Sequence, residues 1–144
     1  MKNEEGYTLI EMMIVLQMIL IITTIVITSF KPMIHELQNE RFIHQLIEDI
    51  YYAQQLSLAG NDITQVLFLP SSHKYNIIHS AKLVYSRSYE QNIEIMNNTL
   101  QVNELRFLAN GNAYKSGSIA IYIDGKLHFL RVLLGKGRFY VEKI

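Results

Sequence analysis

The feature that most constrains this chain is a run of nineteen residues without a charged side chain, from Met12 to Phe30. As a helix this run would extend roughly 28 Å at 1.5 Å per residue, which is about the thickness of the hydrocarbon core of a bilayer. Buried helices of soluble proteins seldom continue that far without a charge. The run therefore predicts a single membrane-spanning helix close to the N-terminus.

A cleaved secretory signal is the main alternative for this segment. Such a signal has a basic N-terminal part, a shorter apolar core and small residues at its cleavage site. Here two glutamates accompany Lys2 before the run, and the bulky sequence Ser29-Phe30-Lys31-Pro32 closes it. We therefore expect the segment to be retained as an anchor. Pro32 is expected either to kink the helix or to mark its exit from the membrane.

Glu11 is a carboxylate at the start of this apolar segment. A carboxylate at the centre of a bilayer costs about 2.5–3.5 kcal/mol on insertion scales. Two interpretations follow. Glu11 lies near the membrane interface, where the positive N-terminal end of the helix favours it, or it pairs with a cation that the neighbouring sequence does not supply.

An amphipathic helix is predicted between Pro32 and the turn-forming sequence Gly60-Asn61-Asp62. From Ile43 onward most apolar residues recur at intervals of three or four, so one stripe can face a core. The expected stripe consists of Leu37, Ile43, Leu46, Ile47, Ile50, Ala53 and Leu56. The acidic residues Glu36, Glu40, Glu48 and Asp49 lie largely off this stripe, and we expect them on a solvated helix face rather than in catalysis.

After Gly60 the periodicity changes from helical to strand-like. The expected strands are residues 64–69, 74–79, 93–95, 105–108, 118–123, 127–134 and 138–141. Asp124-Gly125 and Gly135-Lys136-Gly137 are the expected hairpin turns. The predicted fold class is α+β, with a long N-terminal helix, transmembrane in its first half and amphipathic in its second, packed against an antiparallel β-sheet head.

Composition argues against enzymatic chemistry. The chain has no cysteine, which excludes disulfides, thiolate metal sites and cysteine nucleophiles. Its five histidines show no metal-ligand spacing, and it carries neither a nucleophile elbow nor a phosphate-binding loop. We therefore expect no catalytic residue, metal or cofactor. Its net charge is zero, with an acidic excess in residues 7–60 and a basic excess in residues 61–144.

The sequence Gly6-Tyr7-Thr8-Leu9-Ile10-Glu11, directly before the apolar run, resembles the N-terminal signature of the type IV pilin and pseudopilin superfamily. In the head, Leu105-Arg106-Phe107, Gly111, Gly117-Ser118-Ile119 and Gly135-Lys136-Gly137-Arg138 resemble minor pseudopilins of the GspH/FimT type. The C-terminal residues are similar in particular to the D-type minor pseudopilins of Gram-positive competence machinery. Tyr7 stands where phenylalanine is commoner.

The resemblance implies how the chain is processed and assembled. A prepilin peptidase would cut between Gly6 and Tyr7 and methylate the new amine of Tyr7. Glu11 would then face the cationic amine of a neighbouring subunit, in a medium where opposite charges attract strongly. The implied domains are a cleaved leader (1–6), a transmembrane helix (7–31), its amphipathic continuation (32–60) and a pilin-type β-sheet head (61–144).

The implied function is that of a structural subunit, a minor pseudopilin of a competence pseudopilus needed for DNA uptake. Its implied partners are the other major and minor pseudopilins, the prepilin peptidase, the assembly ATPase and platform protein, and membrane lipid. The head would lie outside the cytoplasm, at the cell surface once assembled. Two alternatives stay open: a pseudopilin of a type II-like secretion system, and a tip subunit that binds DNA through Lys126, Arg131, Lys136 and Arg138.

Overall fold

A computed structural model describes residues 8–135 and 137–144 of the chain. It begins with one long helix, α1 (Leu9–Gly60), which continues through Pro32, so the proline does not end the helix. The helix stops where expected: Asn61 adopts a left-handed conformation with φ 47°, and the Asp62 N–H donates to the Ser57 carbonyl at 3.3 Å. The chain divides into two compact units, Met1–Glu40 and Arg41–Ile144, so α1 contributes to both.

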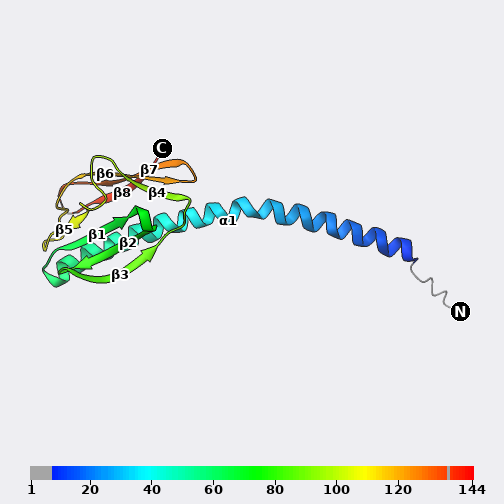
Figure 1. The fold of residues 1–144 in the computed structure, drawn as a ribbon, viewed down its shortest axis with the longest axis horizontal. Helices are drawn as coiled ribbons and strands as arrows, with labels where there is room; N and C mark the ends of the chain where they lie inside the picture. The colour runs from blue at the N-terminus through cyan, green and yellow to red at the C-terminus, as the bar shows by residue number, and fades with distance from the viewer. Residues whose placement is uncertain (1–7, 136) are drawn as a thin grey trace. The chain divides into compact units, whose positions relative to one another are not determined.

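The head strands form, in the described part of the chain, two four-stranded antiparallel sheets rather than the single sheet expected. The first sheet has the order β3-β2-β1-β5 and the second has the order β4-β6-β7-β8. Their bounds are β1 Thr64–Leu69, β2 Lys74–His79, β3 Lys82–Ser88, β4 Ile93–Asn97, β5 Arg106–Phe107, β6 Gly117–Ile123, β7 Lys126–Val132 and β8 Phe139–Lys143, with a short 3-10 helix η1 at Pro70–Ser72 (Figure 1). The predicted α+β class is confirmed.

The sequence predicted all of these strands except β3. This strand follows a tight turn at Ser80 and Ala81, whose φ angles are 50° and 61°. Such a turn usually contains glycine or asparagine, so its sequence gives no signal. The Ser80 hydroxyl donates to the Asp62 carboxylate at 2.5 Å, and the Ser80 N–H donates to the Ile63 carbonyl at 3.2 Å. These contacts hold in place a turn that its own residues disfavour.

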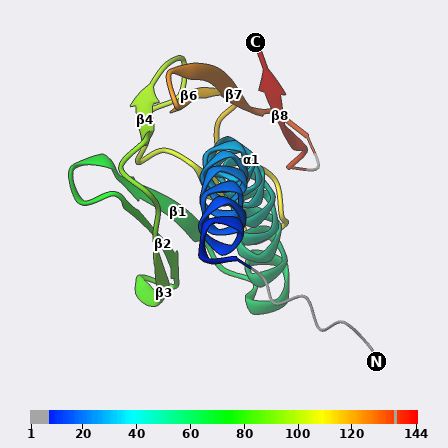
Figure 2. The ribbon, with the colours of Figure 1, turned by 90° about the vertical axis from the view of Figure 1, so that its right-hand side faces the viewer.

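The two sheets share one core with the C-terminal part of α1. In Figure 2 the sheet containing β1, β2 and β3 lies on one side of this part of the helix, and the sheet containing β4, β6, β7 and β8 lies on another. Leu46, Ile50 and Ala53 of α1 are fully buried among residues of both sheets. Ile43 and Ile47 are partly buried against the same core, whereas Leu37 is exposed. The predicted apolar stripe is therefore confirmed from Ile43 onward.

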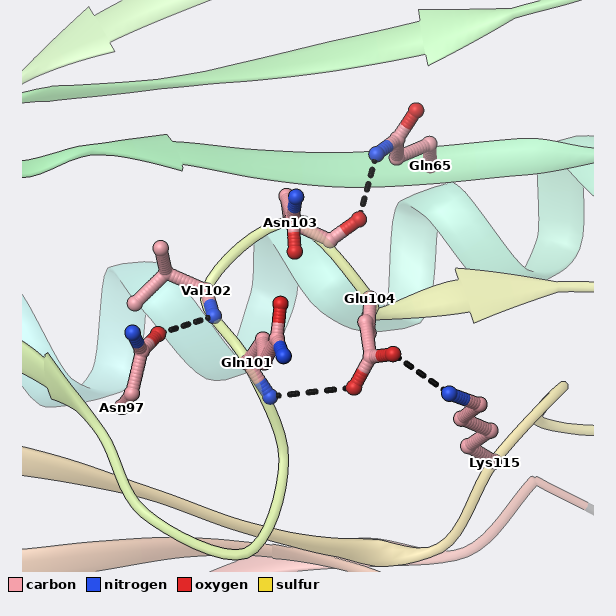
Figure 3. A network of polar contacts seen from close by, with 7 residues as sticks. All are labelled: Gln65, Asn97, Gln101, Val102, Asn103, Glu104 and Lys115. Atoms are coloured by element: carbon pink, nitrogen blue, oxygen red, sulfur yellow. Dashed lines mark hydrogen bonds and ion pairs between the residues drawn. The ribbon is translucent and has the colours of Figure 1, made fainter.

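The segment between β4 and β5 forms hydrogen bonds along the same edge of β1 that β5 pairs with. The Phe68 N–H donates to the Val102 carbonyl at 3.2 Å, and the Val66 N–H donates to the Leu105 carbonyl at 2.9 Å. Side chains fix the path of this segment through the polar network of Figure 3, which joins Gln65 to Asn103, Asn97 to Val102, and Glu104 to both Gln101 and Lys115. The Lys115 ammonium, followed by the Gln101 N–H, lowers the pKa of Glu104.

Replacing Leu46 by alanine should lower the free energy of unfolding by about 2–5 kcal/mol, because the side chain is fully buried and its removal leaves a cavity. The measurement is denaturant unfolding of residues 33–144, a fragment that contains the whole compact unit. Leu83→Ala is the matched control, since Leu83 is 60% exposed and should change stability by less than about 0.5 kcal/mol. Equal effects of the two substitutions would contradict this assignment of the core.

Candidate functional site

The apolar segment expected from the sequence is present as the first part of α1. Leu9–Ile27 is long and apolar enough to cross a membrane, and none of its side chains is buried. This exposure separates the segment from the core helix of a soluble protein, which would be covered by its own chain. The segment fits a single-pass membrane anchor.

Glu11 lies in the first turn of this helix and is exposed. Its backbone N–H donates to the Thr8 carbonyl at 3.1 Å and lies 3.4 Å from the Thr8 hydroxyl, so Thr8 caps the helix start. The carboxylate is therefore close to the positive N-terminal end of the helix. The predicted processing site, Gly6 and Tyr7, lies outside the described residues. The pairing of Glu11 with a neighbouring amine stays a prediction.

Two threonines show how polar groups are accommodated inside the apolar segment. The Thr23 hydroxyl donates to the Ile19 carbonyl at 2.7 Å, and the Thr24 hydroxyl donates to the Leu20 carbonyl at 2.8 Å. Each hydroxyl thus finds an acceptor one turn earlier in its own helix. A threonine can enter a bilayer in this way without any partner from another chain.

Asp49 is the polar centre of the head and corrects an expectation from the sequence. It was expected on a solvated helix face, but it is only 5% exposed, whereas Glu36, Glu40 and Glu48 are exposed as expected. Asp49 stands three residues after Leu46 and four before Ala53, so the 3–4 spacing of the buried stripe already included it. Asp49 was assigned to the solvated face because charged side chains are rarely buried.

The carboxylate of Asp49 is satisfied by groups from two strands of the first sheet. The Arg87 guanidinium of β3 donates to it through Nε at 2.6 Å and through Nη2 at 3.2 Å. The Tyr75 hydroxyl of β2 donates to it at 2.5 Å. The guanidinium also lies 5.4 Å from the centre of the Tyr85 ring. The cluster joins α1 to β2 and β3 through one buried charge.

The cluster changes the acid–base behaviour of its members. Burial, and then the neighbouring Asp49 carboxylate, raise the pKa of Tyr75 well above its usual value. The same two causes raise the pKa of Tyr85 to about 12. The hydrogen bond to Asp49 also raises the pKa of Arg87. All of these directions keep the tyrosines neutral and the arginine charged, which is the state that a structural ion pair requires.

The basic residues proposed for DNA contact are distributed over both ends of the β7–β8 hairpin. Lys126 pairs with Ile123 at one end of β7, and Arg131 pairs with Tyr140 near the other, roughly 17 Å away along the strand. Arg131 forms an ion pair with Glu142 and lies over the Phe129 ring. Arg138 is exposed beside this second end, and Lys136 lies outside the described residues. DNA contact by these residues stays a prediction.

Within the described residues, no three histidine, aspartate or glutamate side chains come together in a way that could hold a metal ion. Two of the described histidines have contacts within the head. His79 accepts or donates a hydrogen bond with the Thr64 hydroxyl at 2.8 Å, and His128 is buried in β7.

Comparison with known proteins gives one clear relative. The competence protein ComGD of Bacillus subtilis (strain 168) is 27% identical over 143 residues, which is 99% of this chain and 96% of the relative. This chain is similar to that competence protein along almost its whole length. The match includes both the apolar helix and the head, and it confirms the resemblance expected from the Gly-Tyr-Thr-Leu-Ile-Glu motif and the glycine-rich C-terminal strands. No family model matches the chain, and no solved structure matches it.

Removing Arg87 should destabilise the head more than neutralising Asp49 does. Arg87→Met leaves a buried carboxylate without its cation and should cost about 3 kcal/mol. Asp49→Asn leaves an arginine whose side chain is 40% exposed and can be solvated, so it should cost only about 1–2 kcal/mol. Denaturant unfolding of residues 33–144 measures both. The interaction is refuted as an ion pair if the double variant loses the full sum of the two single effects.

Proposed function

We propose that this chain is a minor pseudopilin, a structural subunit of a pilus-like competence pseudopilus that takes part in DNA uptake, and that it is not an enzyme. The observation that carries the proposal is the match to a competence protein along almost the whole chain. A match confined to the apolar helix would support an anchor alone. Here the head is included, so the proposal extends to the complete subunit.

The architecture supports a structural role. Most side chains of the first part of α1 are apolar and exposed. This surface must be covered by lipid or by other helices. The head is a compact α+β unit whose buried charge, Asp49, is neutralised within the head itself. An anchor that lipid or other helices can cover, and a head that needs no outside partner for its buried charge, suit a subunit that leaves the membrane and packs beside other subunits.

The proposed organisation follows from this function. Residues 1–6 form a leader that a prepilin peptidase removes, and residues 7–31 span the membrane with the head outside the cytoplasm. Residues 32–60 continue the helix into the head, and residues 61–144 provide its strands. The other pseudopilins, the assembly ATPase and the platform protein are the proposed partners. Direct DNA binding is a weaker proposal, because Arg131 is engaged by Glu142 and Lys126 stands at the opposite end of the hairpin.

The mature chain should begin at Tyr7 and carry one methyl group on its amine. The motivation is the position of Gly6 directly before the aromatic-Thr-Leu-x-Glu sequence. Intact-mass analysis of the protein extracted from membranes should show the loss of residues 1–6 and one added methyl. A Gly6→Leu variant should keep its leader and accumulate as the precursor. Recovery of an unmodified Met1 from cells with an active peptidase would argue against the proposal.

Glu11→Gln should leave synthesis, membrane insertion and cleavage intact but abolish incorporation into the assembly. Glutamine retains the shape of glutamate and its ability to support the first helical turn, so the substitution removes mainly the charge. Incorporation is measured by co-purification with the other pseudopilins and by transformation frequency. Glu48→Gln is the control, since Glu48 is an exposed helical acid in the head. Normal incorporation of processed Glu11→Gln protein would exclude an essential charge pair between subunits.

A further inference from the structure

Gln17 is an uncharged polar side chain at the centre of the apolar segment. It stands one residue from the midpoint of Leu9–Ile27, and its side chain is exposed. Among the described residues nothing forms a hydrogen bond with its amide, in contrast to Thr23 and Thr24, whose hydroxyls bond to carbonyls of their own helix. Gln17 is therefore a polar residue within Leu9–Ile27 whose amide has no partner among the described residues.

Neither water nor the helix itself can satisfy all the polar atoms of this amide in a bilayer. Gln17 lies roughly 12–15 Å from either end of the segment at 1.5 Å per residue, so its short side chain cannot reach the interface as long cationic side chains near helix ends do. A primary amide has two donor hydrogens and one acceptor oxygen. A carbonyl of the preceding turn can accept a second hydrogen bond, as those of Ile19 and Leu20 do, but the N–H groups of the helix interior are already paired, so the amide oxygen finds no donor in its own helix. A second helix is the remaining source of partners.

We propose that Gln17 joins two copies of this chain in the membrane, with the amide of one copy bonded to the amide of the other. Two copies inserted in the same direction place Gln17 at the same depth, and an amide is complementary to another amide. Hydrogen bonds between such side chains are a known means of joining membrane helices. The inference rests on the membrane placement given under the proposed function, and it assigns the chain a self-association site.

The surroundings of Gln17 suit this contact. Met13, Ile14, Leu20 and Ile21 lie one turn before or after it on the same helix face, and all are exposed apolar side chains. Glu11 is six residues away, which places it about 120° around the helix at 3.6 residues per turn. Contact through the Gln17 face thus does not bring the two Glu11 carboxylates together, and like-charge repulsion does not oppose it.

The absence of cysteine permits a direct test with the full chain. Ile21→Cys places a thiol on the Gln17 face, whereas Ile19→Cys places one on the opposite face. Each variant is produced in cells that lack the other pseudopilins, and membranes are oxidised with copper phenanthroline. Disulfide-linked dimers should form with Ile21→Cys and not with Ile19→Cys. Equal cross-linking at both positions would overturn the proposed face.

The amide is tested by substitution in the Ile21→Cys background. Gln17→Leu should weaken dimer formation roughly three- to thirty-fold when the protein is titrated against lipid in vesicles. Gln17→Asn retains an amide and should preserve most of the association, and Thr23→Val is the control for loss of a polar group that is satisfied internally. Unchanged dimerisation of Gln17→Leu, or dimerisation only when other pseudopilins are supplied, overturns self-pairing. Recovery of the chain in the soluble fraction would instead overturn the membrane placement itself.

Discussion

The structure depends on an apolar helix surface that the chain itself does not cover. Every described side chain of Leu9–Ile27 is exposed, although most of them are large and apolar. At about 25 cal/mol per Å² of apolar surface, leaving such a helix in water would be strongly unfavourable. Lipid would cover it in a membrane, and neighbouring helices would cover it in the proposed filament. The apolar character of the segment suits both environments, because both are largely apolar.

Polar residues in this segment are then explained by how each is satisfied. Thr23 and Thr24 use carbonyls of the preceding turn. Glu11 stands in the first turn, where the backbone N–H groups carry partial positive charge. Gln17 has neither solution. The threonines therefore need no other chain, whereas Gln17 needs one and Glu11 is proposed to use one. Substitution of Glu11 or Gln17 should alter assembly rather than insertion, and substitution of the threonines should not.

Local pattern predicted most of the elements of the head but not how they meet. The helix end at Gly60 and the strands β1 and β2 were predicted with their observed bounds, because period and turn residues are local properties. Strand β3 was missed because Ser80 and Ala81 turn without glycine. Asp49 was misplaced because its cation, Arg87, is thirty-eight residues away and its hydroxyl donor is on another strand. Contacts between residues so far apart in the sequence depend on the fold, and a short stretch of sequence does not indicate them.

One glycine of the C-terminal turns has a packing role. Gly137 has φ 54°, and a Cβ there would lie 2.2 Å from Nε2 of Gln54 and 2.4 Å from the carbonyl oxygen of Gly111. That amide of Gln54 donates to the carbonyls of Gly111 at 2.8 Å and of Gly137 at 3.3 Å. One buried side chain of α1 therefore holds two turns of the head against the helix.

This arrangement explains why a glycine stands at position 137. A side chain at Gly137 would displace Gln54 and separate the two turns, so the glycine is tied to the fold and not to a ligand. Packing thus accounts for Gly137, whereas it does not constrain exposed residues in this way. Gln17 in the first part of α1 and Arg138 beside β8 are examples of such exposed residues.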